Sequence, residues 1–250
     1  MGLALNIGHD EDWAYRQVQL HKAPHLLVAG MTGSGKSVFT NAVVSDLITR
    51  WSPRQVSFLM IDPKRVELAP YRGIPHLLAD PVYRPDTAKE LLWWAVGQMN
   101  RRYEDLANYG VRTNLDLTPD KMFTPIIVIV DELANIILAD KKVEKPLVEI
   151  ASMGRAASIH LLLATQRPSA DVLTGLLRAN IPMRVCMSVQ TAVDSRIMLD
   201  ETGAEKIRTP GEMLVRFPRD HGLTRMKGDF VSDEDIDKAV AAAMQWKGKP

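Results

Sequence analysis

Five short apolar runs recur along the chain, and stretches with helical spacing separate most of them. The runs have the length and the β-branched content of strands that are buried on both faces. They cover residues 25–30, 56–62, 125–131, 159–165 and 183–189. Because strands that alternate with helices favour a largely parallel sheet covered by helices on both faces, the pattern predicts an α/β fold.

The most regular helical pattern covers residues 86–109, where apolar residues return every three or four positions. Gly110 follows as a stop signal, so we expect one long helix here. Residues 1–21 alternate only weakly between apolar and polar positions and predict a small β-type flap. The flap would precede a single domain that covers residues 22–250.

The last part of the chain predicts a hairpin followed by a helix. Residues 211–217 and 223–231 flank the turn-forming sequence Pro-Arg-Asp-His-Gly, which is typical of a β-hairpin. Ser232 and Asp235 have the spacing of a capping box. We therefore expect a final helix that begins after Ser232 and extends to about Trp246.

Composition is that of an ordinary globular protein. The 250 residues are 46% hydrophobic and 24% charged, and a chain of this size can form one large α/β domain. The 31 Lys and Arg residues nearly balance the 30 Asp and Glu residues, so any DNA binding must be local. The single cysteine, Cys186, excludes an internal disulfide.

Apolar stretches in the sequence all fall far short of the ~20 residues that a membrane helix needs. We therefore expect no membrane contact from this chain and a cytoplasmic location. The location fits either a whole protein or the cytoplasmic part of a longer, membrane-anchored one.

The first apolar run leads directly into a glycine-rich octapeptide with the Walker A pattern G-x-x-x-x-G-K-[ST]. The octapeptide consists of Gly30, Met31, Thr32, Gly33, Ser34, Gly35, Lys36 and Ser37. Its glycines let successive backbone N–H groups surround phosphate oxygens. Lys36 is suited to neutralise the β- and γ-phosphates of ATP, and the Ser37 hydroxyl to bind Mg²⁺. The alternative is a glycine-rich turn with an accidental lysine, against which the flanking strand and helix argue.

Two adjacent carboxylates follow the third apolar run, at the end of its predicted strand. Asp131 and Glu132 form the Walker B arrangement. Asp131 is expected to hold the Mg²⁺ shell, and Glu132 to polarise the water that attacks the γ-phosphate. The same pair could instead cap the helix that follows.

Polar residues also end the second and fourth runs. Thr165 and Gln166 lie where α/β sheets gather ligand groups and could sense the γ-phosphate, or they could merely begin a loop. Asp62 and Lys64 follow the second run. Their sequence fits a nucleotide role and a turn equally well, and both interpretations stay open.

Taken in order, these motifs resemble the FtsK/SpoIIIE family of hexameric DNA translocases, specifically its RecA-like motor domain. The resemblance covers roughly residues 20–235. Beside the two Walker motifs, it is carried by MIDPK at 60–64, GIPHLL at 73–78, RRY at 101–103, RAASIH at 155–160, ATQRPS at 164–169, ANIP at 179–182, DSR at 194–196 and GEML at 211–214. It implies a RecA-like P-loop NTPase that assembles as a homo-oligomer, expected to be a hexameric ring.

The family also implies a shared active site. ATP lies between neighbouring motor domains, and an arginine of one subunit reaches the γ-phosphate held by the next. The resemblance gives this role to Arg155, and a guanidinium suits it because its charge is spread over several donors. A solvated surface arginine is the alternative. Arg196 is a less specific interface candidate, and its role stays open.

Family members thread duplex DNA through the ring and hold its backbone with two loops per subunit. The loops correspond here to residues 111–119 and 167–180, which we name the first and second DNA loops. Arg167 and Arg178 match phosphate-contacting positions, so they are candidates for sequence-independent DNA contacts, although each could be an ordinary surface charge. Ala192 stands where family members often carry a lysine, and the first DNA loop is shorter, which implies weaker or differently arranged pore contacts.

The leading hypothesis is therefore an ATP-dependent double-stranded DNA translocase motor for chromosome, plasmid or phage DNA. A protein-translocation ATPase of a type VII secretion system is the alternative, since such ATPases resemble the same motor. In that case Arg167 and Arg178 would be dispensable. A third hypothesis, a nucleotide-binding scaffold without turnover, conflicts with the intact Lys36, Asp131 and Glu132.

Overall fold

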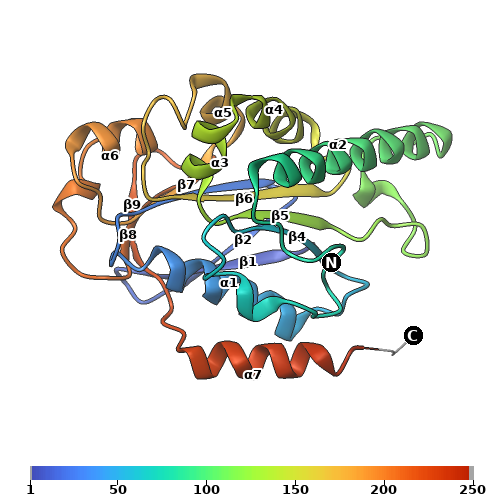
Figure 1. Ribbon diagram of the computed structural model, residues 1–250, viewed down its shortest axis with the longest axis horizontal. Helices are drawn as coiled ribbons and strands as arrows, with labels where there is room; N and C mark the ends of the chain where they lie inside the picture. Colours follow the sequence, from blue (N-terminus) through green and yellow to red (C-terminus); the bar gives the residue numbers. More distant parts are fainter. Residues whose placement is uncertain (1, 248–250) are drawn as a thin grey trace.

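A computed structural model describes residues 2–247 as a nine-stranded sheet between two layers of helices (Figure 1). The strand order is β2-β1-β9-β8-β7-β3-β6-β5-β4. Five neighbouring strands run parallel, namely β3 (His25–Ala29), β4 (Ser57–Ile61), β5 (Ile126–Val130), β6 (Ile159–Thr165) and β7 (Met183–Cys186). The predicted α/β fold with a parallel core is confirmed. Residue 1 of the predicted flap and residues 248–250 of the predicted domain lie outside the described residues.

The parallel strands are buried along their whole length and mostly apolar because helices cover both of their faces. On one face, Leu26, Phe58 and Ile127 belong to the core beneath α1 (Lys36–Arg50) and α7 (Asp233–Met244). The alternate residues point into a second core on the opposite face. That core is covered by α2 (Pro85–Asn108), α3 (Leu133–Ala139), α4 (Glu144–Met153), α5 (Gly175–Asn180) and α6 (Ala192–Leu199). Short 3₁₀ turns lie at Ala69–Tyr71, Asn114–Asp116, Lys141–Val143 and Ala204–Lys206.

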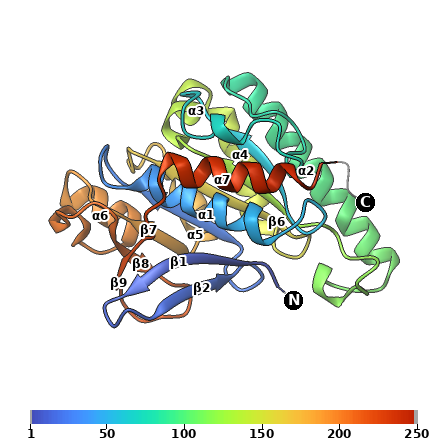
Figure 2. The ribbon, with the colours of Figure 1, turned by 90° about the horizontal axis from the view of Figure 1, so that it is seen from below.

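Four antiparallel strands extend one edge of the parallel core. The predicted hairpin is present as β8 (Glu212–Arg216) and β9 (Thr224–Lys227), and the predicted final helix as α7. The predicted N-terminal flap consists of β1 (Ala4–Asp10) and β2 (Tyr15–Gln19), and β1 pairs with β9 (Figure 2). This segment therefore shares the sheet, and its buried side chains share the core beneath α1.

Most predicted boundaries lie within a few residues of the observed ones. The largest differences are at β9, which ends at Lys227 rather than at residue 231, and at β7, which ends at Cys186 rather than at residue 189. Met187 and Val189 are buried outside the strand, so apolar character there reflects burial rather than strand pairing. In the described part of the chain, no helix combines the length and hydropathy that crossing a bilayer requires.

Two histidines are buried at the amino ends of β3 and β6. Nδ1 of His160 lies 3.0 Å from the carbonyl oxygen of Pro24, to which it can donate, and Nδ1 of His25 accepts the Leu161 N–H at 3.0 Å. Burial lowers the pKa of His25 to about 3 and that of His160 to about 4. Both side chains are therefore neutral parts of the core.

These histidines predict an acid-sensitive fold. Since an unfolded histidine has a pKa near 6.5, the unfolded chain binds more protons than the folded chain below about pH 6.5. The stabilisation is complete above that pH and is lost as the pH falls toward the folded-state values. We expect the free energy of unfolding to fall by about 2 to 4 kcal/mol between pH 7 and pH 5, measured by urea denaturation.

The variant His160→Asn tests the source of this effect, because an amide can still donate to Pro24 but does not titrate. Its unfolding free energy should depend on pH about half as steeply as that of the wild type. The matched control is His221→Asn, at an exposed hairpin tip, which should keep the wild-type slope. Equal slopes in all three proteins would contradict the assignment.

Candidate functional site

The carboxyl ends of β3, β6 and β5 bring the predicted motifs together at one edge of the sheet. β6 lies between the other two strands, with Ala29 paired to Thr165 and Val130 paired to Leu163. The N–H of Gly30 donates to the carbonyl of Thr165 at 3.2 Å. Gln166 therefore follows β6 between the Walker A loop (residues 30–37) and the Walker B carboxylates.

The Walker A loop has a backbone that requires glycine. Gly33 and Gly35 have φ values of 81° and 100°, in the left-handed region that other residues rarely adopt. A Cβ on Gly35 would lie only 2.8 Å from the backbone nitrogen of Gly211. α1 begins directly after Gly35, so its N-terminus faces the loop.

Lys36 is buried and paired with the Walker B strand. Its Nζ donates to Oδ1 of Asp131 at 3.0 Å and to the Asp131 carbonyl at 2.9 Å. The two side chains are only 3% and 1% exposed, so this contact is an internal ion pair rather than an accidental surface contact. Burial raises the pKa of Asp131, and the Lys36 ammonium opposes that rise.

The second carboxylate oxygen of Asp131 is unpaired in the described part of the chain. Oδ2 is buried and has no hydrogen-bond partner among the described residues. An unpaired carboxylate oxygen is a ligand that Mg²⁺ prefers, and Ser37, with its hydroxyl, directly follows Lys36, the partner of Asp131. The residues present therefore fit the predicted metal ion.

Glu132 is held against β6 and not against its own helix. Its carboxylate accepts from the Thr165 hydroxyl at 2.8 Å and from the Gln166 N–H at 3.0 Å. Glu132 occupies the N-cap position of α3, yet its side chain makes no capping hydrogen bond. The Glu132 side chain therefore does not cap α3. Thr165 and Gln166 do not merely begin a loop, because both donate to the Glu132 carboxylate. The Gln166 side chain also accepts from the Thr32 hydroxyl at 3.2 Å.

The structure separates the roles of Asp62 and Lys64, which the sequence left open. The buried carboxylate of Asp62 accepts backbone N–H groups of Lys64, Arg65 and Leu68, so it stabilises the turn after β4. Nζ of Lys64 lies 3.4 Å from Oε2 of Glu132. Lys64 therefore faces the site, and Asp62 shapes the backbone that carries it.

A cavity of about 380 Å³ adjoins the Walker A loop. One part is lined by residues 31–33 and 35–38 together with Glu67 and Gln166. The other part is lined by Phe39, Met187, residues 210–211 and residues 227–230. Sequence analysis missed this second part, because β8, β9 and the segment after β9 carry no nucleotide motif.

Arg155 lies near the amino end of β6, at the opposite end of the parallel strands from the Walker A loop. It precedes β6, whereas the Walker A loop follows the carboxyl ends of the strands, and a strand of seven residues spans about 23 Å. Its Nε donates to the carbonyl of His21 at 2.7 Å, and the side chain is exposed. Arg155 therefore cannot reach the Walker A loop of its own chain.

Two residues of α2 anchor the turn that carries Arg155. The guanidinium of Arg102 donates to the carbonyls of Ala157 and Thr124, both at 2.8 Å. The Tyr103 hydroxyl donates to the carbonyl of Met153 at 2.7 Å, at the end of α4. Burial lowers the pKa of Arg102 to about 10. These contacts give a structural reason for the RRY motif.

The first DNA loop is joined to the same turn through Asn114. The Asn114 backbone N–H donates to the carbonyl of Ala156 at 2.9 Å, and its side-chain amide donates to the Ser158 hydroxyl at 2.9 Å. Asn114 is buried, and Ser158 has a positive φ of 52°. The turn and the loop are therefore held together by specific hydrogen bonds.

The two candidate DNA-binding arginines differ in their surroundings. Arg167 is exposed, and its guanidinium has no hydrogen bond or ion pair within residues 2–247. Arg178 is half-buried and donates to the carbonyls of Leu173 and Ile197 at 3.1 Å and to Asp200 at 3.3 Å. Arg167 is thus free to bind an anion, whereas Arg178 already ties α5 to α6. Arg196 is exposed as well.

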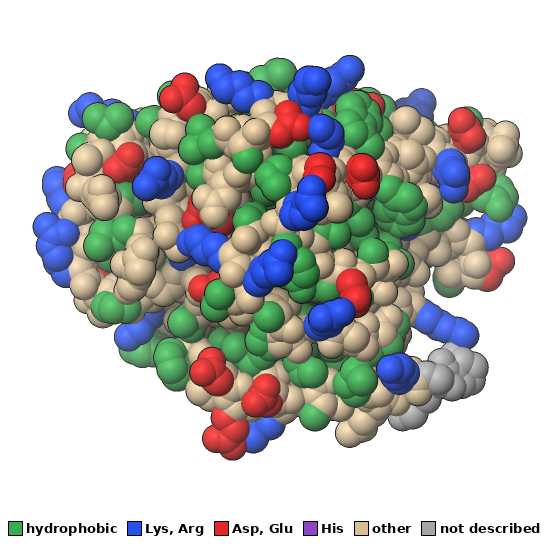
Figure 3. Space-filling model, in the orientation of Figure 1, with side chains coloured by type: hydrophobic (Ala, Val, Ile, Leu, Met, Phe, Trp, Pro, Cys, Tyr) green, Lys and Arg blue, Asp and Glu red, His purple; other side chains and the backbone are tan. Residues whose placement is uncertain are grey.

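Surface charge is mixed on the face shown in Figure 3. Lys and Arg side chains are spread over this face with Asp and Glu side chains among them. This distribution agrees with the net charge of +1. DNA binding through this face would have to use local contacts and not a continuous basic field.

The sequence profile of the FtsK/SpoIIIE family matches residues 5–121 and 116–170. The DNA translocase FtsK of Lactococcus lactis subsp. cremoris is 42% identical over 251 residues, a match that covers 95% of this chain and 33% of that protein. The DNA translocase FtsK of Oceanobacillus iheyensis is 45% identical over 235 residues, covering 89% and 30%. The chain thus spans about a third of the length of these relatives.

Solved structures share the fold at lower identity. The pCW3 conjugation coupling protein TcpA, in a monomer form with ATPγS, has a TM-score of 0.84 and 24% identity. The match covers 96% of this chain and 70% of that one. The cytoplasmic domain of the type VII secretion ATPase EccC from Thermomonospora curvata has a TM-score of 0.83 and 24% identity, covering 96% and 31%. At this identity the likeness concerns the fold alone.

The buried pair of Lys36 and Asp131 predicts a large stability cost when only one partner is removed. Lys36→Ala leaves a buried carboxylate without its cation and should lower the free energy of unfolding by about 3 kcal/mol at pH 8. The added substitution Asp131→Asn should recover more than half of that loss, which a double-mutant cycle by urea denaturation measures.

The matched control for this cycle is Lys89→Ala, which breaks the partly exposed pair with Asp140. That loss should stay below about 1 kcal/mol. If Lys36→Ala and Lys89→Ala cost the same, the Lys36 pair would not be the buried interaction described above.

Proposed function

Because the chain belongs to the FtsK/SpoIIIE family, we propose that it is the ATP-driven motor of a double-stranded DNA translocase. The observation that carries the proposal is the convergence of Lys36, Asp131, Glu132 and Gln166 beside a cavity that the Walker A loop lines. The relatives named DNA translocase FtsK are about three times as long as this chain. DNA translocation, the cytoplasmic location and the process served are therefore parts of the proposal.

In the proposed mechanism, the triphosphate of ATP binds in the Walker A loop. Lys36 would exchange its contact with Asp131 for the β- and γ-phosphates, and this frees the Asp131 carboxylate. Mg²⁺ bound by Ser37 and Asp131 would supply neutralising charge on the phosphate oxygens. Glu132 would take the proton of the attacking water, and Gln166 would contact the γ-phosphate.

The position of Arg155 supports hydrolysis between subunits. Its distance from the Walker A loop of its own chain and its exposed side chain suit a residue that completes the site of a neighbour. A guanidinium in that position would stabilise the transition-state charge on the γ-phosphate. We therefore propose a ring, expected to be hexameric, in which each subunit supplies Arg155 to the next.

We propose that DNA contacts the second DNA loop through Arg167 and Arg178. Arg167 carries more of this proposal, because its guanidinium has no partner in the described part of the chain. Arg178 would have to give up its contact with Asp200 in order to bind a phosphate. Phosphate contacts carry no base code, which suits a motor that passes over any sequence.

The proposal predicts ATP hydrolysis that duplex DNA stimulates. Steady-state turnover should rise severalfold with linear duplex DNA at low salt, and Arg167→Ala should raise the DNA concentration for half-maximal stimulation roughly threefold or more. Glu132→Gln controls for contaminating ATPases, since it loses the base but keeps the cavity. Arg219→Ala removes an exposed arginine at the hairpin tip and should respond to DNA as the wild type does.

Turnover that is unaffected by DNA at both low and moderate salt would contradict the DNA motor. Turnover that rises instead with a substrate polypeptide would favour the protein-translocation ATPase of a type VII secretion system.

The shared site predicts complementation between subunits. Arg155→Ala should bind ATP but hydrolyse it about 100-fold or more slowly, because the transition-state charge is left uncompensated. Mixing it with Lys36→Ala should restore part of the activity, since some interfaces then combine an intact Lys36 with an intact Arg155. Rings assembled from both variants that stay inactive would rule out the trans-acting arginine.

A further inference from the structure

Phe230 is an exposed aromatic side chain at the cavity beside the Walker A loop. Its side chain is 79% exposed, although residues 227–230 form one wall of that cavity. Leaving a phenylalanine ring in water forgoes the free energy of burying it. An exposed ring on the wall of a ligand-sized cavity is therefore a candidate contact for a flat, apolar part of a ligand.

Backbone hydrogen bonds fix this wall to the Walker A loop. The Gly211 N–H donates to the Ser34 carbonyl at 2.9 Å, and the Gly228 N–H donates to the Gly211 carbonyl at 2.9 Å. A Cβ on Gly228 would approach the Phe39 ring to 3.4 Å, so the wall is also packed against α1. Backbone hydrogen bonds thus connect the Walker A loop to Gly228, two residues before Phe230.

The cavity determines on which side of the phosphates the nucleoside of a bound nucleotide lies. Toward the sheet, the buried side chains of Lys36 and Asp131 bound the site. The rest of the lining of the same cavity includes Phe39, Gly211 and Phe230. With the phosphates in the Walker A loop, the nucleoside therefore extends toward Phe230.

We propose that the Phe230 ring is the platform on which the base of the bound nucleotide stacks. The inference rests on the proposed function, since it assigns the nucleoside half of the same ATP site. Stacking uses the face of the base and not its polar edge, so the platform accepts either purine. Phe230 thereby contributes affinity for the base without selecting between ATP and GTP.

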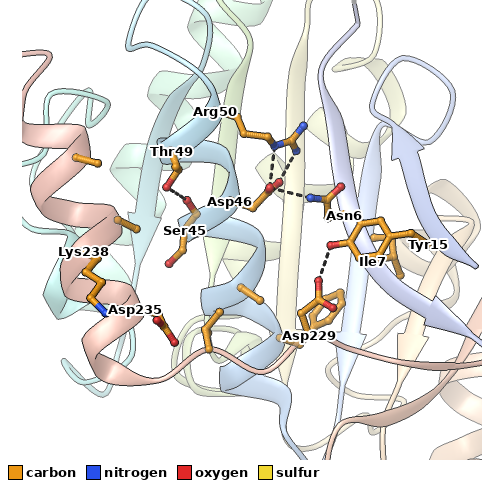
Figure 4. A pocket seen from close by; sticks show the side chains of 15 residues that line it. Asn6, Ile7, Tyr15, Ser45, Asp46, Thr49, Arg50, Asp229, Asp235 and Lys238 are labelled. Carbon is orange, nitrogen blue, oxygen red and sulfur yellow. Dashed lines mark hydrogen bonds and ion pairs between the residues drawn. The ribbon is translucent and has the colours of Figure 1, made fainter. Parts of the chain in front are cut away.

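A contact with the N-terminal hairpin positions the platform. The Tyr15 hydroxyl donates to Oδ2 of Asp229 at 2.5 Å, and Nε2 of His9 lies 3.6 Å from Oδ1. Figure 4 shows the side chains of Tyr15 and Asp229 in direct contact in the lining of a second cavity, between α1, α7 and the N-terminal strands. Asp229 lines both cavities and directly precedes Phe230. Tyr15 is therefore a positioning residue for the base platform.

Calorimetric titration with Mg²⁺-ATPγS, Mg²⁺-GTPγS and inorganic tripolyphosphate tests the platform. Phe230→Ala should weaken both nucleotides roughly tenfold and leave tripolyphosphate unchanged, and Phe230→Trp should bind nucleotides at least as well as the wild type. Tyr109→Ala removes an exposed aromatic residue at the far end of α2 and is the matched control. Wild-type nucleotide affinity in Phe230→Ala, or an equal loss for tripolyphosphate, would overturn the assignment.

The positioning role of Tyr15 has its own test in Tyr15→Phe, which removes only the hydroxyl. We expect a two- to fivefold weaker nucleotide affinity, an unchanged tripolyphosphate affinity and an unchanged melting temperature to within about 4 °C. Unchanged nucleotide affinity would remove Tyr15 from the inference.

These measurements distinguish a failure of the proposed function from a failure of the base platform alone. A wild-type protein that binds no ATPγS, or that binds it as well after Lys36→Ala, overturns the proposed function and the platform together. Binding that needs Lys36 but survives Phe230→Ala overturns the platform alone.

Discussion

The arrangement of the site depends on the parallel pairing of β3, β6 and β5. In the dry interior of the sheet, every backbone N–H and C=O must find a partner, and this requirement fixes the register of Ala29 against Thr165 and of Val130 against Leu163. Apart from His25 and His160 near their amino ends, the three strands are apolar up to their carboxyl ends, so the other polar side chains lie where the strands end together. The Walker A loop, Glu132 and Gln166 are therefore brought together by backbone geometry before any ligand binds.

The charged groups of the site satisfy one another within the protein. Lys36 contacts Asp131, and Glu132 accepts from Thr165, from the Gln166 N–H and from Lys64. Binding of a triphosphate is therefore an exchange of partners, and its free energy is the difference between two paired states. Among these carboxylate oxygens, Asp131 Oδ2 alone has no hydrogen-bond partner in residues 2–247, so a cation held there would add a contact instead of replacing one.

Sequence patterns could predict the features that are local along the chain. Buried strands, the Walker A loop and the capped final helix each depend on residues within a few positions of one another. The remaining features depend on contacts between distant segments. The sequence could not tell whether Glu132 caps α3 or turns toward β6, because that choice is made by Thr165 and Gln166. The wall formed by residues 227–230 escaped prediction for the same reason, since pairing of β1 with β9 and of Gly228 with Gly211 places it.

The buried side chain of Asn114 has a mechanical consequence. It joins the first DNA loop to the turn that carries Arg155, and Arg102 and Tyr103 hold that turn against the long helix α2. A displacement of the loop must therefore break these hydrogen bonds or carry the turn with it. The loop and the turn are thus one hydrogen-bonded unit, and a loop displaced with these bonds intact would carry the turn of Arg155 with it.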